Sequence, residues 1–135
     1  MFPFDLTTSA LGSALRGLTL RHEALAQNVA NADSPGYRRV DVTFEGALAD
    51  AIAEDQAVAT SGTRQDGAWS GSTAATDAVQ PELTTEQGTT MRVDGGDVDP
   101  DREMSELAAN QLQHQAVTTL LGKRLEGLKT VIAGR

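Results

Sequence analysis

Apolar residues recur at alternating intervals of four and three positions through the first quarter of the chain. This spacing places them on one side of a helix and is typical of a seam that packs on other helices. The seam positions are Leu11, Leu15, Leu18, His22, Leu25, Val29 and Ala32. Only His22 is polar. We therefore expect a long helix that begins at a hydroxyl cap, Thr7, Thr8 or Ser9, and ends near Asn31.

This first helix contains residues that weaken it and ends at residues that stop it. Gly12 and Gly17 each cost about 1 kcal/mol relative to alanine, so the helix depends on packing partners. After its end, Pro35 lacks the amide needed to continue a helix, and Gly36 accepts the positive φ of a tight turn. The sequence therefore predicts an abrupt corner.

The residues around this corner could bind a ligand or could simply shape the backbone. Side-chain amides beside a turn, such as Asn28 and Asn31, more often cap and shape the chain. We therefore interpret the corner motif as structural. Its residues are Asn28, Asn31, Ser34, Pro35, Gly36 and Tyr37.

The middle of the chain carries weaker patterns. Residues 38–44 alternate between apolar and polar positions, which suggests a short strand, and residues 44–55 return to helical spacing. Residues 56–88 are rich in Ala, Thr, Ser, Gly and Gln without a sustained period, so we expect a long loop. A further short strand at 89–93 and a turn at 94–97 complete the segment.

A second long helix is predicted from Asp99 and Pro100 to about Ile132. The aspartate can cap the first amides, and proline fits the first helical position. Its best seam is Leu107, Gln111, His114, Thr118, Leu121, Leu125, Leu128 and Ile132. If the two helices pair antiparallel with matched seams, the numbers of facing residues sum to roughly 136, because both rise about 1.5 Å per residue. This register would place His22 beside His114 in one polar layer.

These patterns predict a mostly α fold with two long N- and C-terminal helices in an antiparallel coiled coil. A short second helix and a long loop or small β region lie between them. We divide the chain into an N-terminal helix and corner (1–37), a middle segment (38–98) and a C-terminal helix (99–135). Only 39% of the 135 residues are apolar and 4% are aromatic. Because this is little material for a compact core, we expect an elongated shape.

Composition also excludes several functions. The chain has no cysteine, which removes disulfides and thiolate chemistry. Its net charge of −8 argues against a nucleic-acid partner. The acidic residues concentrate in 40–103, whereas both ends are near neutral and can approach further copies. No apolar run reaches the roughly 20 residues of a membrane span, and residues 1–10 do not resemble a cleavable signal, so any export is expected to use another route.

The sequence gives only weak signals for metal-binding or catalytic residues. His22 and His114 have no local partner ligand, so we interpret both as polar seam residues that help set the register. Aspartates at 97, 99 and 101 resemble half of a calcium loop, but Arg102 stands where that loop needs glycine. No nucleophile, phosphate-binding or zinc-hydrolase motif occurs. We therefore expect no enzyme activity, cofactor, metal or small-molecule substrate.

The sequence QNVANADSPGY at 27–37 resembles the signature of bacterial flagellar basal-body rod proteins. Residues 38–48 and the C-terminal segment from Asp94 to about Ile132 are most similar to the proximal rod member of that family. Ser34 stands where the family more often has threonine, and His114 where it usually has tyrosine. The resemblance covers about residues 8–50 and 94–133 and is silent on 56–90.

The resemblance implies a structural subunit of the proximal rod, the part of the drive shaft that carries torque from the rotor ring towards the distal rod and hook. It implies a location in the basal body and export through the flagellar type III apparatus in a largely unfolded state. Implied partners are other copies of the chain, other flagellar rod proteins, and rotor-ring and rod-adaptor proteins at the rod base. The alternative is a two-helix dimerising binding module that presents its acidic loop to a basic partner.

Overall fold

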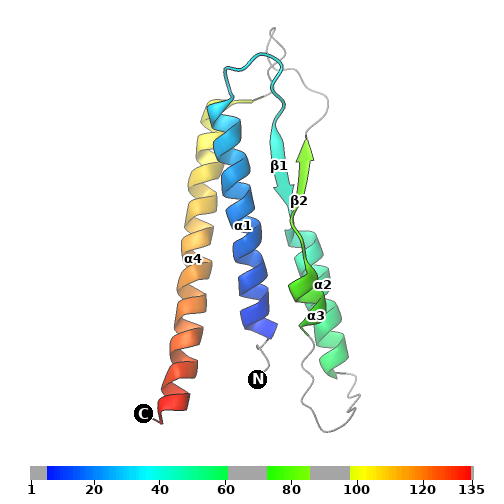
Figure 1. Cartoon of the computed structure of the whole chain (residues 1–135), viewed down its shortest axis with the longest axis vertical. Helices are drawn as coiled ribbons and strands as arrows, with labels where there is room; N and C mark the ends of the chain where they lie inside the picture. The colour runs from blue at the N-terminus through cyan, green and yellow to red at the C-terminus, as the bar shows by residue number, and fades with distance from the viewer. Residues whose placement is uncertain (1–5, 61–72, 86–97, 135) are drawn as a thin grey trace. The chain divides into compact units, whose positions relative to one another are not determined.

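The computed structural model describes residues 6–60, 73–85 and 98–134. Its fold is mostly helical, as the sequence predicts, with long N- and C-terminal helices (Figure 1). The elements in chain order are α1 (Leu6–Ala30), β1 (Val40–Thr43), α2 (Glu45–Thr60), α3 (Ala74–Ala78), β2 (Glu82–Thr85) and α4 (Pro100–Ala133). The chain divides into two compact units, and α1 and α4 contribute to both.

The first unit comprises Met1–Leu15, Phe44–Gln80 and Ala116–Arg135. Within it, the buried carboxylate of Asp55 on α2 accepts hydrogen bonds from the Thr76 amide at 2.9 Å and the Thr76 hydroxyl at 2.6 Å. Two serines of α1 hold the same short helix: Ser13 Oγ donates to the Thr76 carbonyl at 2.8 Å, and Ser9 Oγ donates to the Asp77 carboxylate. Polar contacts therefore connect α2, α3 and the start of α1.

The bounds of the elements in this unit correct two expectations from the sequence. The cap predicted at Thr7, Thr8 or Ser9 is wrong, because α1 already begins at Leu6 and all three residues lie inside it. Ser9 uses its hydroxyl for a tertiary contact instead. The predicted loop at 56–88 is wrong in part, because α2 continues to Thr60 and the segment also holds α3 and β2. Elements of four or five residues are too short to give a measurable period.

The second unit comprises Arg16–Thr43 and Pro81–Gln115. The strand predicted from the alternation at 38–44 is confirmed as β1, which pairs antiparallel with β2 from Val40 opposite Thr85 to Thr43 opposite Glu82. Val42 is fully buried. The Val42 carbonyl accepts hydrogen bonds from Arg21 Nε at 3.2 Å and Arg21 Nη2 at 2.6 Å, so α1 covers part of the strand edge opposite β2.

In this unit α1 and α4 pack together and run antiparallel, as predicted. Asn110 Nδ2 donates to the Leu18 carbonyl at 3.0 Å, and Asn28 Nδ2 donates to Glu103 Oε2 at 2.8 Å. The predicted register is wrong. It placed Leu18 opposite Thr118, about one heptad further along α4 than Asn110.

The two ends of α4 follow from local chemistry. Asp99 Oδ1 accepts the amide of Asp101 at 3.0 Å, so the predicted aspartate cap and proline start are confirmed. At the other end the chain leaves the helix through Gly134, whose φ of +68° is readily adopted only by a residue without a side chain. The strand predicted at 89–93 and the turn at 94–97 lie outside the described residues.

Candidate assembly interface

The corner after α1 is built from local hydrogen bonds. The Ser34 amide donates to the Asn31 carbonyl at 2.9 Å, and the Tyr37 amide donates to the Ser34 carbonyl at 3.2 Å. Asn31 Nδ2 donates to the Gln27 carbonyl one turn back at 2.9 Å. Gly36 has a φ of +73°, and Pro35 lies exposed beside it. A side chain at Gly36 would be strained in this conformation.

Asn28 has a wider role than the rest of the corner motif. Its amide is completely buried and uses all four of its hydrogen-bonding positions. Nδ2 donates to the Val40 carbonyl and to Glu103 Oε2, both at 2.8 Å. Oδ1 accepts from the Val40 amide at 3.0 Å and from the Tyr37 hydroxyl at 3.2 Å. One side chain therefore joins α1 to β1, to the corner and to α4.

Arg39 and Glu103 extend this contact into a buried ion pair. Arg39 Nε lies 2.6 Å from Glu103 Oε1, and Arg39 Nη2 lies 2.6 Å from Glu106 Oε2. Arg39 is 3% exposed and Glu103 is fully buried. Burial alone would lower the pKa of Arg39, but the hydrogen bond that Arg39 donates to Glu103 and the negative charges of the nearby carboxylates outweigh it and raise the pKa above its ordinary value. We call Asn28, Arg39 and Glu103 the buried polar junction.

Tyr37 lies next to the buried polar junction. Its hydroxyl donates to Asn28, and its pKa is raised, first by burial of the phenol and then by the negative charge of Glu103. Both effects disfavour the phenolate.

The sequence did not indicate Arg39 or Glu103. Arg39 falls on the polar side of an alternating strand, where a charged side chain is expected to face solvent. Glu103 lies in the first turn of α4, where an acid is explained by the helix dipole. No spacing rule links an arginine to a glutamate 64 residues away.

The α1 seam residues are mostly covered within the chain. Leu18 and Leu25 are buried, and Leu11, Leu15 and Val29 are half-buried. His22 is exposed. With Leu18 beside Asn110, it cannot share a layer with His114.

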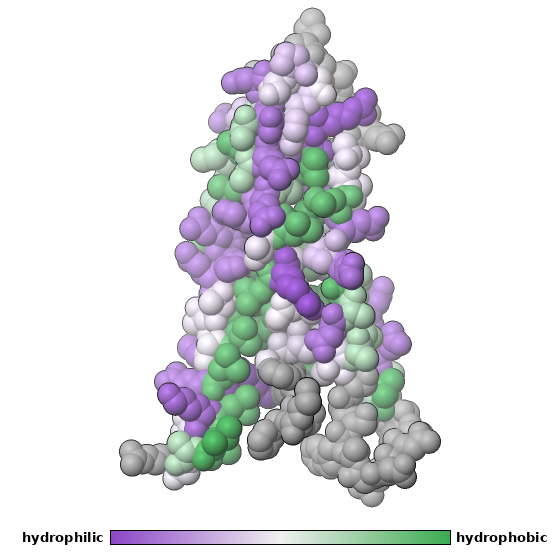
Figure 2. Space-filling view, in the orientation of Figure 1, coloured by the Kyte–Doolittle hydropathy of each residue, from purple (hydrophilic) through white to green (hydrophobic). Residues whose placement is uncertain are grey.

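The α4 seam becomes more exposed towards the C-terminal end of the helix. Leu107, His114 and Leu121 are half-buried, whereas Leu125 and Leu128 are 48% and 47% exposed. Ile132 is exposed further, at 75%. Figure 2 shows hydrophobic surface along the C-terminal part of α4. Exposed apolar surface of this kind marks a protein interaction site.

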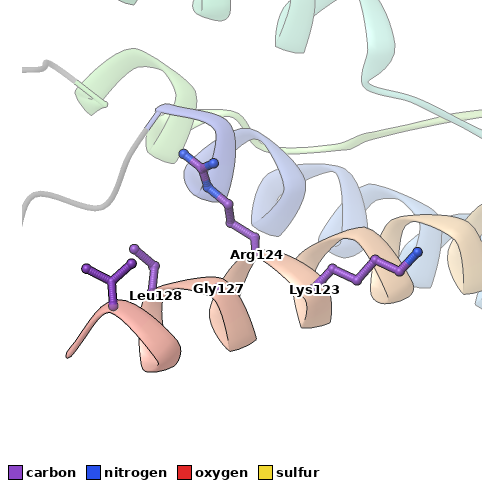
Figure 3. A pocket seen from close by; sticks show the side chains of 5 residues that line it. Lys123, Arg124, Gly127 and Leu128 are labelled. Atoms are coloured by element: carbon purple, nitrogen blue, oxygen red, sulfur yellow. The ribbon is translucent and has the colours of Figure 1, made fainter. Parts of the chain in front are cut away.

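A shallow groove lies on this part of α4 and is lined by Lys123, Arg124, Gly127, Leu128 and Val131. Figure 3 shows the Lys123 and Arg124 side chains leaving the helix in different directions at one end of the groove. Among the residues that the structure describes, no atom outside the helix lies within 4 Å of the position that a Cβ on Gly127 would take. The described part of the chain therefore leaves open space beside Gly127.

Other kinds of site were sought in the same residues. Across 6–60, 73–85 and 98–134, no three acidic or histidine side chains come together in a way that could hold a metal ion. In the part of the chain that the structure describes, none of the helices combines the length and apolarity needed to cross a membrane.

A mostly helical chain with an exposed apolar face on its C-terminal helix is typical of proteins that pack against partners. Three relatives show which family of proteins the chain belongs to. The chain is 33% identical over 125 residues to the flagellar basal body rod protein FlgB of Salmonella typhimurium, covering 84% of this chain and 83% of the relative. It is 30% identical over 139 residues to FlgB of Borrelia hermsii, covering 96% and 97%. It is 28% identical over 131 residues to FlgB of Bacillus subtilis, covering 97% and 96%.

The chain belongs to the FlgB family of flagellar basal body rod proteins. It is a structural subunit of the flagellar rod, and the alternative of a dimerising binding module is not supported. No family model matches the chain.

Proposed function

We propose that the chain forms part of the proximal rod and helps to carry torque from the rotor ring towards the distal rod and hook. The observation that supports this most directly is the exposed apolar face at the end of α4, in a chain of the FlgB family. A rod subunit needs such a face because its neighbours must bury it.

In this proposal the two seams form a coiled coil that is completed in the assembly. The α1 seam is already covered by its own chain near Leu18 and Leu25, whereas α4 offers Leu125, Leu128 and Ile132 to neighbours. The neighbours are other copies, other rod proteins, and rotor-ring and rod-adaptor proteins at the rod base. A seam that is partly buried and partly exposed fits a helix that packs both against its own chain and against neighbouring subunits.

The buried polar junction contributes stiffness. Torque requires the terminal helices to keep their relative position under load, and apolar seams alone can slide by one heptad. Asn28, Arg39 and Glu103 resist such a shift, because moving either helix would leave buried charges without partners.

Export through the flagellar type III apparatus requires an unfolded or easily unfolded chain. Gly12 and Gly17 lower the stability of α1 by about 1 kcal/mol each relative to alanine. The absence of cysteine means that no disulfide would oppose unfolding. We propose that the chain folds fully only when neighbours cover α4.

A complementation experiment tests the proposal. Cells that lack the chain are expected to build no rod and to lose swimming, and the wild-type chain should restore both. The double variant Leu125→Ser with Leu128→Ser should be made and exported but leave the rod incomplete, because the apolar surface that neighbours bury is removed. Glu126→Ser with Lys129→Ser is the matched control and should restore swimming. Normal rods in cells without the chain would refute the proposed function.

A further inference from the structure

The small sheet of the second unit has two edges, and side chains of α1 close the edge on β1. Asn28 accepts a hydrogen bond from the Val40 amide at 3.0 Å and donates one to the Val40 carbonyl at 2.8 Å. Arg21 Nη2 donates to the Val42 carbonyl at 2.6 Å. The backbone polar groups of Val40 and Val42 therefore point away from β2, and β1 lies between α1 and β2 (Figure 1).

This arrangement determines which backbone groups of β2 lie at the other edge. In an antiparallel pair of strands, the amide and carbonyl of every second residue face the partner strand, and those of the residues between face away. The pairs that are hydrogen-bonded across the sheet are thus Asp41 with Thr84 and Thr43 with Glu82. The amides and carbonyls of Leu83 and Thr85 face away from β1, and no residue that the structure describes bonds to them there.

The outer edge of β2 lacks the usual protection of a sheet edge. Proteins protect such edges with lysine, proline, a bulge or a covering element. The sequence of β2 is ELTT, its pairing with β1 has no bulge, and all four of its residues are exposed. A two-stranded sheet is marginally stable by itself, so a third strand would stabilise it. The edge of β2 therefore offers the groups that a further strand uses.

The two faces of the sheet indicate which kind of strand fits this edge. Leu83 lies opposite the fully buried Val42 and on the same face, yet it is 58% exposed. Glu82 and Asp41 lie on the other face, because side chains alternate along a strand. An added strand is therefore favoured if it places an apolar residue beside Leu83 and a basic residue beside Glu82. The strand β2 of a second copy does not meet this requirement, since antiparallel pairing would bring both Glu82 carboxylates to one face.

We propose that the outer edge of β2 binds an extended segment of another flagellar protein, which adds a third strand to the sheet. The segment alternates apolar and basic residues. The backbone groups of Leu83 and Thr85 supply hydrogen bonds, and the two faces of the sheet select the sequence. This inference rests on the proposed role in the rod and names one contact within it.

Thr85→Pro tests the backbone contact. Proline removes the Thr85 amide and places its ring at the outer edge, whereas the pairing of β2 with β1 does not use that amide. The variant should reduce the number of complete rods at least about tenfold. Thr85→Ala is the matched control, because it loses the same hydroxyl but keeps the amide, and it should assemble normally. Equal urea midpoints of the two variants, measured with a stabilising osmolyte, check that both fold alike.

Hydrogen exchange in wild-type rods tests the same contact without a substitution. The Thr84 amide faces β1 and serves as an internal reference. If a strand is added, the amides of Leu83 and Thr85 should exchange within about threefold of the Thr84 rate. Exchange of both amides more than roughly tenfold faster than Thr84 would show that the edge is free, and this measurement decides if the two variants differ in stability.

Cross-linking identifies the segment that occupies the edge. A photoreactive phenylalanine derivative in place of Leu83 should link, in assembled rods, to a segment of another flagellar protein with alternating apolar and basic residues. The same derivative in place of the exposed Glu54 on α2 is the control and should not link to that segment. A link from position 83 to β2 of a second copy, to residues 86–97 of the same chain or to a helical segment would overturn the inference.

The outcomes separate this contact from the proposed function. If the wild-type chain is needed for rods but Thr85→Pro assembles like Thr85→Ala, the added strand is wrong and the proposed function stands. If rods form in cells without the chain, the proposed function fails, whatever binds to β2.

Discussion

Replacing Arg39 by methionine is the sharpest test of the buried polar junction. Methionine fills much of the arginine volume but leaves the fully buried Glu103 carboxylate without its ion pair, 2.6 Å from the lost Nε. Of the side chains that the structure describes, only the Asn28 amide, at 2.8 Å, would then donate a hydrogen bond to the Glu103 carboxylate. Breaking a buried pair from one side costs about 3–5 kcal/mol, a large part of the stability of a small protein.

Arg102→Met is the matched control. Arg102 pairs with Glu106, which also pairs with Arg39, but it does so at the protein surface. Its Nε lies 2.9 Å from Glu106 Oε1, but the Arg102 side chain is 57% exposed. Loss of this exposed pair should cost about 0–1 kcal/mol. The double variant Arg39→Met with Glu103→Met should recover more than half of the loss caused by Arg39→Met, because removing both charges leaves neither buried alone.

Urea unfolding followed by circular dichroism measures these differences, with a stabilising osmolyte at fixed concentration to populate the folded chain. The shift in midpoint multiplied by the urea dependence gives the change in the free energy of unfolding. If Arg39→Met shifts the midpoint no more than Arg102→Met, the junction does not stabilise the contact between α1, β1 and α4.

Three further predictions concern the corner and the isolated chain. Pro35→Ala with Gly36→Ala should extend α1 and abolish swimming without reducing expression, and wild-type swimming would refute the corner's role. Because the pKa of Tyr37 is raised above its ordinary 10.0, the unfolded chain loses this proton first, so stability should fall as pH rises through about 10. Tyr37→Phe should flatten that fall, and the absorbance of the only tyrosine reports the ionisation directly. The dilute wild-type chain should show weak helical circular dichroism; a cooperative, strongly helical melt independent of concentration would contradict this.

The sequence predicted the long elements well because their signals are local. The four-and-three spacing of the leucines marks α1 and α4, and Asp99 with Pro100 marks the start of α4 within one residue. The alternation from Val40 to Phe44 identified β1 for the same reason. By contrast, α3 and β2 depend on contacts far along the chain, such as the hydrogen bonds between Asp55 and Thr76. Nothing in their own four or five residues encodes them.

The burial of the seam residues was predicted less evenly than the fold. The seam spacing correctly marked Leu18 and Leu25 as residues that pack, since both are buried. It gave no information on which seam residues remain exposed, because a spacing rule does not say whether the covering helix belongs to the same chain. The exposure of the seam residues Leu128 and Ile132 is known only from the structure.

The register of α1 on α4 shows most clearly why apolar spacing was insufficient. Two seams with the same four-and-three repeat match equally well after a shift of one heptad, so leucines cannot choose between registers. The pairing of His22 with His114 was chosen because it placed two polar interruptions together. The structure uses other polar groups: Glu103 is buried against Asn28, and Asn110 reaches the Leu18 carbonyl. A shift of one heptad would leave the buried Glu103 carboxylate without hydrogen-bond partners. The exposed His22 stays hydrated in either register, so the shift costs it no free energy. The polar residues with the greatest desolvation cost therefore set the register, and they could be recognised only after Arg39 was seen to be buried with them.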